Sequence, residues 1–363
     1  MRPGIFRQEE FFEQYEFHCR YMLALSGVQP LSSTELAGLV PEGPPDVELG
    51  YTASAGQPRL RELVAAGYPG AGAENVMVTV GAIEALLIAV NLLVGPGDEA
   101  VCLWPSYQPL HELVTAAGGE VRFVRLAPAD GFAIDLDRVR AAVTARTRLV
   151  VLNVPHNPTG RDVPAADLVA LADDLARRGV HLLVDEVFRR MWAGARATAW
   201  SGPRNLLVVD GLSKAFGLPG LRIGWLVGPP ELVVRARQYR KYTTLNPGAL
   251  DQAWACVALR HAETILARSH GLVRAGLDLA LPWFAARPEH FELTAPAGGG
   301  LLFPRLRHGG PVHEFCVRLV DETGVLLAPG SDCYDMEGFL RVGFATPQLA
   351  EGLDRLDAFL RRS

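Results

Sequence analysis

The chain has 363 residues and a formal net charge of −5, from 35 Lys or Arg and 40 Asp or Glu. Apolar residues make up 49% of the chain, which is the composition of a folded globular protein and excludes disorder. A mildly acidic chain without basic blocks predicts neither nucleic acid nor an anionic membrane surface as its main partner.

The amino-terminal residues carry four Glu within the first sixteen and no apolar core, so they do not fit a secretory signal. The longest apolar stretch, from Ala82 to Val94, contains Glu84 and Asn91 and is too short to span a bilayer. The five cysteines are widely spaced without a CxxC pair, so neither a disulfide framework nor a metal site is indicated. We expect a cytoplasmic protein.

Short β-branched runs alternate with helix-like stretches between residues 75 and 228. The predicted strands are Val76–Val80, Ala100–Leu103, Val121–Leu126, Leu149–Val154, Leu182–Asp185, Leu206–Asp210 and Ile223–Val227, and the helix-like stretches include Ile83–Leu93 and Ala165–Arg178. This alternation predicts an α/β fold with a mainly parallel sheet covered by helices on both faces. In such sheets the ligand site lies at the carboxyl ends of the strands.

The pattern changes after Pro229. Helices are predicted at Glu231–Tyr242, Leu250–Arg260, Ala262–Phe284, Val312–Glu322 and Pro347–Arg361, and strands at Phe291–Leu293, Gly300–Leu306, Val325–Leu327 and Phe339–Phe344. We therefore predict a large domain of residues 46–285 and a smaller α+β domain made of residues 1–45 and 286–363.

A glycine-rich segment from Asp210 to Gly224 follows a predicted strand and contains Lys214 and, eight residues later, Arg222. A lysine at this place in an α/β protein can act as a Schiff-base nucleophile. The planar fork of an arginine can bind a phosphate in the same pocket. An isolated Ser-Lys pair is usually a surface feature, but the whole segment with the partners described next favours a functional site.

Two polar residues lie at or after the ends of predicted strands. Asn157, in the segment His-Asn-Pro-Thr-Gly, is held in an extended or turn conformation by the following proline, and its amide can donate into a site. Asp185 closes a predicted strand, where a buried carboxylate needs a cation such as a protonated pyridine nitrogen. The alternatives are a plain turn for Asn157 and a helix N-cap for Asp185.

The residues Gly81, Ala82 and Ile83 mark the change from a strand to a helix. Free backbone N–H groups and the positive end of the helix can bind a phosphate there. Neither GxGxxG nor GxxxxGK occurs, so no dinucleotide or nucleoside triphosphate loop is indicated. Tyr107 follows the strand ending at Leu103 and can stack on a flat heterocycle, the alternative being an ordinary half-buried loop aromatic.

Together and in this order, these motifs resemble the fold type I pyridoxal-phosphate enzymes of the class I/II aminotransferase superfamily over nearly the whole chain. The resemblance implies an aminotransferase-like large domain, pyridoxal 5'-phosphate as cofactor and a small α-amino acid as substrate. It implies that Lys214 forms the Schiff base and moves the substrate's α-proton, and that Asp185 pairs with the pyridine nitrogen. The remaining cofactor contacts that it implies are Asn157, Tyr107, Ser213, Arg222 and the backbone of Gly81, Ala82 and Ile83.

Two further positions match the superfamily, and two depart from it. Arg341 matches the arginine that binds the substrate carboxylate, and Tyr51 matches a tyrosine that the partner subunit lends to the phosphate, which implies a homodimer. Phe188 stands where a tyrosine usually bonds the ring oxygen, and Gly211 where a serine is common. A lost hydroxyl removes a hydrogen bond worth about 1 kcal/mol, so we expect cofactor binding to persist while the outcome of the reaction stays open.

Short segments also resemble the capreomycidine synthase-like branch, namely Ser26–Pro30 with Glu35 and Leu36, Phe188, and Gly298–Arg305. Members of that branch cyclise a β-hydroxyarginine by α-proton removal, loss of the β-hydroxyl and attack of the guanidine. Two reactions are therefore kept open, amino transfer and this elimination with cyclisation. We expect Ser26, Gly27 and Asn157 beside the substrate.

Other classes of function are less favoured. A carbon–carbon or carbon–sulfur lyase remains an alternative, because one scaffold supports several reactions. A ligand-sensing regulator with an aminotransferase-like domain needs a DNA-binding module with a basic recognition helix, for which the chain before about Leu49 has no room. A hydrolase is disfavoured because Ser106 lies outside any GxSxG motif.

Overall fold

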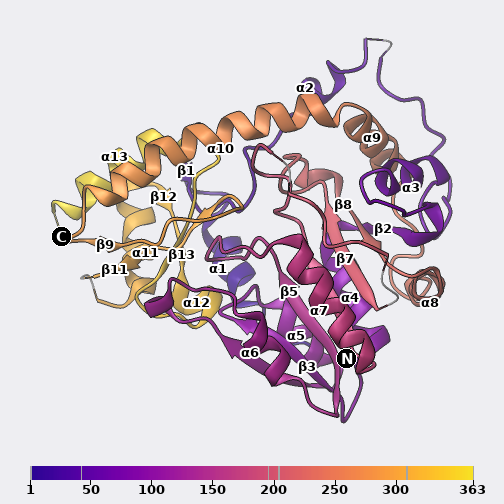
Figure 1. Ribbon diagram of the computed structural model, residues 1–363. Helices are drawn as coiled ribbons and strands as arrows, with labels where there is room; N and C mark the ends of the chain where they lie inside the picture. Colours follow the sequence, from indigo (N-terminus) through magenta and orange to yellow (C-terminus); the bar gives the residue numbers. More distant parts are fainter. Residues whose placement is uncertain (1, 42, 195, 203–204, 308–309, 363) are drawn as a thin grey trace.

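The computed structural model describes residues 2–41, 43–194, 196–202, 205–307 and 310–362. Within these residues the central sheet has seven strands in the order β2-β8-β7-β6-β5-β3-β4 (Figure 1). The strands are β2 (Val76–Val80), β3 (Glu99–Trp104), β4 (Glu120–Arg125), β5 (Thr147–Asn153), β6 (His181–Asp185), β7 (Leu206–Gly211) and β8 (Ile223–Val227). Each of the seven predicted strands is present, so the predicted α/β fold class is confirmed.

The direction of the strands decides which loops meet. Strands β4, β3, β5, β6 and β7 are mutually parallel, whereas β8 runs antiparallel to both of its neighbours, β7 and β2. Strand β2 therefore runs in the same direction as β7. As a result β8 begins at the edge where the other six strands end.

Helices cover both faces of this sheet (Figure 1). They include α4 (Gly81–Leu93), α5 (Pro109–Ala116), α6 (Leu136–Ala142), α7 (Ala165–Arg177) and α8 (Pro230–Arg240), with the short turns η1 (Ala73–Asn75), η2 (Pro128–Asp130) and η3 (Pro219–Leu221). Successive strand residues point to opposite faces. Val150 and Leu152 accordingly join one buried apolar cluster, while Leu149 and Val151 join the other.

The carboxyl-terminal third adds smaller sheets and long helices. Its helices are α9 (Ala249–Arg260), α10 (Ala262–Ala285), α11 (Val312–Thr323), α12 (Gly330–Tyr334) and α13 (Leu349–Leu360), and its strands β9 (Phe291–Glu292), β10 (Leu301–Leu302), β11 (Arg305–Leu306), β12 (Val325–Leu326), β13 (Ala328–Pro329) and β14 (Leu340–Gly343). The single strand predicted at Gly300–Leu306 is wrong, because β10 pairs with β14 and β11 pairs with β9. Pro304 separates them, since proline has no N–H for a sheet ladder.

The amino-terminal segment contributes α1 (Arg7–Tyr15), β1 (Tyr21–Met22), α2 (Ser33–Ala37) and α3 (Pro58–Ala65). Strand β1 pairs in parallel with β12, so the two ends of the chain share a small sheet. The division into residues 46–285 and residues 1–45 with 286–363 stays a prediction.

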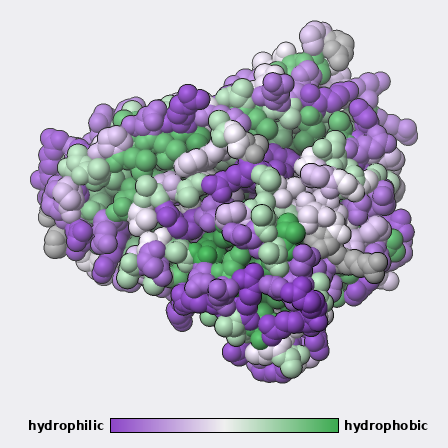
Figure 2. All heavy atoms as spheres, viewed as in Figure 1, coloured by the Kyte–Doolittle hydropathy of each residue, from purple (hydrophilic) through white to green (hydrophobic). Residues whose placement is uncertain are grey.

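The long helix α10 crosses the top of the molecule from α9 toward α13 (Figure 1). On the same face, Figure 2 shows hydrophobic side chains gathered below α10 and hydrophilic side chains around the rim. Among the described residues, no helix combines the length and the apolar character that crossing a membrane requires.

Candidate active site

The predicted site residues converge at one edge of the central sheet. The parallel register places Asn153 of β5 beside Asp185 of β6, and Asp185 beside Val209 of β7. A cavity of about 580 Å³ opens at this edge, a size typical of small-molecule sites. The sequence-predicted residues that line it are Ser26, Ala82, Ile83, Tyr107, Asn157, Asp185, Ser213, Lys214, Arg222 and Arg341.

Three predicted residues do not line the cavity. A Cβ on Gly27 would lie 3.2 Å from the Cα of Lys214, so this glycine packs directly against the lysine backbone. Gly81 adopts a φ of +70°, and a Cβ on it would lie 2.7 Å from Nη2 of Arg222. The side chain of Tyr51 is 89% exposed and lies outside the cavity of its own chain. Its contact with a neighbouring subunit stays a prediction.

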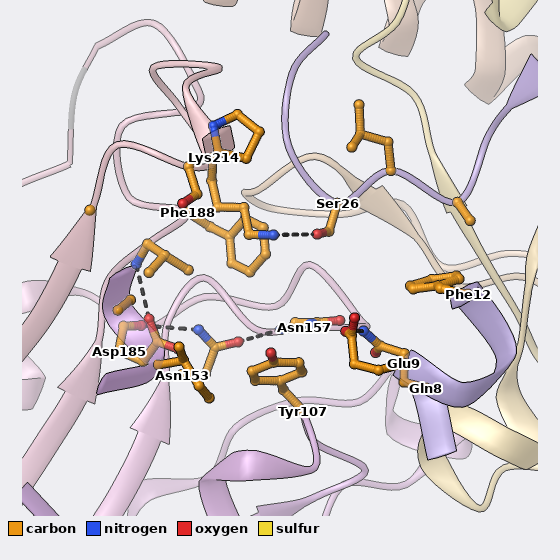
Figure 3. Close-up of a pocket in the computed structure, with 18 of the residues that line it drawn as sticks. Gln8, Glu9, Phe12, Ser26, Tyr107, Asn153, Asn157, Asp185, Phe188 and Lys214 are labelled. Carbon is orange, nitrogen blue, oxygen red and sulfur yellow. Dashed lines mark hydrogen bonds between the residues drawn. The ribbon is translucent and has the colours of Figure 1, made fainter. Parts of the chain in front are cut away.

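Lys214 points into the cavity, where its Nζ donates a hydrogen bond to Oγ of Ser26 at 2.7 Å (Figure 3). Burial lowers the pKa of the Lys214 ammonium to about 8, and the nearby charge of Arg341 acts in the same direction. About one tenth of the lysine is therefore unprotonated at pH 7, far more than for a lysine with the ordinary pKa. The neutral amine is the form that can attack a carbonyl or accept a proton.

Asp185 is 4% exposed, and its Oδ1 accepts a hydrogen bond from the backbone N–H of Val187 at 3.1 Å. Burial raises the pKa of this carboxyl to about 7. Across the described residues no Lys or Arg forms an ion pair with it. A carboxyl in this position is suited to a ligand that brings its own cation.

Hydrogen bonds extend from Asp185 to the neighbouring loop. Asn153 donates from Nδ2 to the backbone oxygen of Asp185 at 3.1 Å, and its Oδ1 accepts the backbone N–H of Asn157 at 2.7 Å (Figure 3). The Oδ1 of Asn157 accepts a hydrogen bond from the hydroxyl of Tyr334 at 2.7 Å. The side chain of Asn157 is thus held at the cavity wall.

An anion-binding corner forms where β8 begins against the start of α4. A Cβ on Gly224 would lie 2.4 Å from the backbone nitrogen of Ala82, so only glycine allows this approach. The first turn of a helix leaves its N–H groups without intrahelical acceptors and carries a partial positive charge. Arg222 and Ser213 line the cavity at the same place, which makes it suited to a phosphate group.

Arg341 lies on β14, is 1% exposed and lines the cavity. Its Nη1 donates to Oη of Tyr334 at 2.7 Å and to Oε1 of Gln8 at 3.1 Å. Its Nη2 donates to the backbone oxygen of Ala24 at 2.9 Å, while Nε has no partner within the described chain. Donors on Nε and Nη2 therefore remain for a carboxylate.

Helix α1 also lines the cavity, which the sequence reasoning missed. Gln8, Glu9 and Phe12 reach it from this helix (Figure 3). Glu16, the residue directly after the helix, also lines it. The Phe12 ring centroid lies 5.4 Å from the guanidinium carbon of Arg341. The acidic and aromatic amino-terminus was the available signal, but nothing in the sequence connects it with residues more than 100 positions away.

The donor set fits pyridoxal phosphate. Arg222, Ser213 and the start of α4 would hold the phosphate, and Asp185 would meet the ring nitrogen with the carboxylate that has no other cation. Lys214 would meet the carbonyl carbon, and the aromatic ring of Tyr107 lines the same cavity. These positions agree with the sequence-based assignment, and the individual roles stay predictions.

Comparison with known proteins identifies the class. Residues 46–356 match the family model described as aminotransferase class I and II. The chain belongs to this family, and it is a pyridoxal-phosphate-dependent enzyme acting on an α-amino acid. The predictions of family, cofactor and enzyme class are thereby confirmed.

Individual relatives include both chemistries that the sequence left open. The chain is 37% identical over 355 residues to capreomycidine synthase of Streptomyces vinaceus, covering 95% of this chain and 91% of that protein. It is 32% identical to aspartate/prephenate aminotransferase of Thermus thermophilus, covering 86% and 84%.

The similar solved structures also include both an aminotransferase and a cyclase. A PLP-dependent aminotransferase from Streptococcus suis superposes with a TM-score of 0.93 at 29% identity, covering 100% of this chain and 99% of that one. The PLP-dependent cyclase OrfR superposes with a TM-score of 0.91 at 32% identity, covering 100% and 98%.

The attachment residue can be tested with little ambiguity, because the chain has two lysines, Lys214 and Lys241. Borohydride reduction of the purified enzyme should fix the cofactor on Lys214, as detected by peptide mass spectrometry. Lys214→Ala should abolish the fixed adduct and turnover while leaving the thermal unfolding of the cofactor-free protein nearly unchanged. Lys241→Ala is the matched control and should retain both. An adduct on Lys241 would contradict the assignment.

The raised pKa of Asp185 predicts a defined pH dependence for the cofactor-free protein. Between 3.8 and about 7 the unfolded chain releases this proton while the folded chain retains it, so the contribution of Asp185 to stability falls as pH rises. Asp185→Asn cannot ionise. Urea unfolding should therefore show the variant gaining stability relative to the wild type from pH 5 to pH 8, although it binds the cofactor more weakly. A pH-independent difference would exclude this explanation.

Proposed function

We propose that this enzyme is a cyclase of the capreomycidine synthase type. Its substrate would be an α-amino acid with a β-hydroxyl group and a guanidinium side chain. The observation that carries the proposal is a pair of carboxylates, Glu9 and Glu16, in the cavity that also contains Lys214 and Arg341. Support comes from the capreomycidine synthase and cyclase relatives.

The two acidic residues favour a cationic side chain in the substrate. Glu9 and Glu16 are seven positions apart, which places them on one side of the helical path two turns apart. Burial raises the pKa of Glu16, and the negative charge of Glu9 adds to this shift. A bound cation would relieve this repulsion, whereas an acidic side chain would increase it.

Arg341 accounts for the other end of the substrate. It is buried, its Nη groups are held by Tyr334, Gln8 and Ala24, and Nε remains unused. A carboxylate bound there would fix the amino acid, while the glutamates would receive the opposite charge. Two oppositely charged subsites in one cavity select an amino acid with a cationic side chain.

In the reaction, Lys214 is placed to take the α-proton, because its pKa near 8 allows the amine both to accept and to return a proton near neutral pH. Pyridoxal phosphate, when bound, supplies a ring that withdraws electrons from the α-carbon. The β-hydroxyl leaves with a proton as water. A guanidine nitrogen then forms a bond to the β-carbon and releases a proton, and the α-carbon regains a proton from Lys214. The overall change is loss of one water and closure of one ring, without an oxidant.

Amino transfer is the alternative on the same scaffold. It needs a 2-oxo acid as amino acceptor, whereas the proposed cyclisation does not. Phe188 has no hydroxyl to offer the ring oxygen, and it lines the cavity beside Lys214. This departure from the aminotransferase pattern supports the elimination route.

A substrate test separates the two reactions. With β-hydroxyarginine and no 2-oxo acid, mass spectrometry should detect a product lighter by one water. Glu9→Gln and Glu16→Gln should each lower kcat/KM for this substrate about ten-fold, roughly 1.4 kcal/mol, because each removes a charge facing the guanidinium. Glu10→Gln is the matched control, since Glu10 lies on α1 but does not line the cavity.

Two outcomes would contradict the proposal. One is conversion that depends strictly on a 2-oxo acid, which would identify an aminotransferase. The other is an equal loss of activity in the three glutamate variants, which would indicate an effect on α1 rather than on substrate recognition.

We further propose a homodimer that works in the cytoplasm. The hydroxyl of Thr52 donates a hydrogen bond to the backbone oxygen of Pro247 at 3.0 Å, which brings two segments of the chain together. Large exposed side chains gather in these two segments. They are Leu49, Tyr51, Tyr242, Leu245 and Leu250. Such a concentration is typical of an interface. The five cysteines are free thiols, which suits a reducing compartment.

Tyr51 provides the test of the shared site. Tyr51→Phe should weaken cofactor retention by about 1–2 kcal/mol, the range for a hydrogen bond to a charged group. Tyr242→Phe removes a hydroxyl that is equally exposed and should leave retention unchanged. Equilibrium dialysis measures the affinity, and sedimentation measures the mass. A fully active monomer, or normal retention in Tyr51→Phe, would argue against the shared site.

A further inference from the structure

A continuous hydrogen-bond chain joins Arg341 to Asn157 through Tyr334, the last residue of α12. A guanidinium only donates, so the Tyr334 hydroxyl accepts from Nη1 of Arg341 at 2.7 Å. The proton of that hydroxyl is then available for Oδ1 of Asn157, also at 2.7 Å. The guanidinium fixes the direction of the first bond, and the amide oxygen of Asn157 that faces the hydroxyl fixes the direction of the second.

The bond from Tyr334 occupies one end of the Asn157 amide. Oδ1 is engaged by Tyr334, so Nδ2 is the end that remains for a ligand. The backbone N–H of Asn157 is held separately by Asn153, which leaves the side-chain rotation to Tyr334. Phe188 supplies no hydroxyl, so Asn157 carries more of the hydrogen bonding to the cofactor ring than it would beside a tyrosine.

Tyr334 itself does not touch the cavity. It is 1% exposed and absent from the cavity lining. Its ring packs edge-on against Phe303 at a centroid distance of 5.6 Å, a contact that phenylalanine would keep. The effect of its hydroxyl can therefore be separated from the packing of its ring.

We propose that Tyr334 is a positioning residue that aligns the Asn157 amide toward the cofactor and couples it to Arg341. A carboxylate that binds Arg341 competes for the positive charge that polarises the Tyr334 hydroxyl. The hydrogen bond from Tyr334 to Asn157 then changes, and with it the bond that Asn157 gives to the cofactor ring. The inference rests on the proposed roles of Arg341 and Asn157, but not on which reaction follows.

The test uses Tyr334→Phe in the cofactor-loaded protein. The readout is the pH midpoint of the visible absorbance, measured with and without saturating propionate, a carboxylate that lacks an amine. In the wild type, propionate should shift this midpoint, and in Tyr334→Phe the shift should fall to less than half. Cofactor affinity, measured by titrating the cofactor-free protein, should weaken about three- to ten-fold, the range for one hydrogen bond.

Two controls identify the cause. Tyr21→Phe removes a hydroxyl from another buried tyrosine, one bonded to Glu351 outside the cavity, and should preserve the wild-type midpoint shift. In an Asn157→Ala background, adding Tyr334→Phe should have little further effect on cofactor affinity, because the two residues act in series. A purely structural role would give the same loss in both backgrounds.

The proposal is overturned by a wild-type propionate shift in Tyr334→Phe, by additive losses in the double variant, or by a Tyr334→Phe protein that does not fold. If Asn157→Ala alone leaves cofactor affinity unchanged, the assumed role of Asn157 is wrong, and the inference fails with it. If cyclisation is not observed while the absorbance results hold, the proposed reaction fails and the positioning role stands.

Discussion

The burial of Asp185 at the end of β6 is the constraint on which the rest of the site depends. A carboxyl at this depth retains its proton up to about pH 7 unless a cation comes to it. The two residues that hydrogen-bond to Asp185 do not supply that cation, because Asn153 donates to its backbone oxygen and Val187 donates only an N–H. Burial raises the pKa of this carboxyl more than the charge of Lys214 lowers it. Ionising Asp185 in the folded protein therefore costs free energy. A cationic ring nitrogen would offset this cost, which links cofactor binding to stability.

The site also depends on the antiparallel direction of β8, which places Arg222 at the same edge of the sheet as Asp185. This strand illustrates what the sequence could and could not predict. Short β-branched runs made each central strand predictable, and the change from strand to helix at Gly81 made the start of α4 predictable. The reversal brings Arg222 to the same edge, and only the motif, not the pattern of the strands, indicated this. The break at Pro304 was missed because two short strands with different partners read as one apolar run.

The contacts made by α1 and Tyr334 could not be predicted, because they join residues far apart in the chain. Gln8 reaches Arg341 across 333 positions, and Tyr334 reaches Asn157 across 177. The local pattern of apolar and polar residues does not indicate which distant residues come into contact. The sequence predicted most of the groups to which chemical roles are assigned here, since the majority follow strands in recognisable motifs. The groups that orient them depend on how the small sheets pack against the large one.

Helix α1 contacts Arg341 and also contributes an acidic side chain to the cavity. Gln8 accepts a hydrogen bond from Arg341, while its neighbour Glu9 lines the cavity and accepts from the Gln8 amide at 3.3 Å. In the proposed function, this short helix would support Arg341 and would supply a negative charge for the substrate side chain. A substrate that binds both Arg341 and Glu9 would hold α1 against the cavity. A substrate that binds neither would leave Lys214 bonded to the hydroxyl of Ser26. Selectivity and alignment of the reacting groups would then have the same physical origin, because the proposed charges lie on and directly after the helix that would position the substrate.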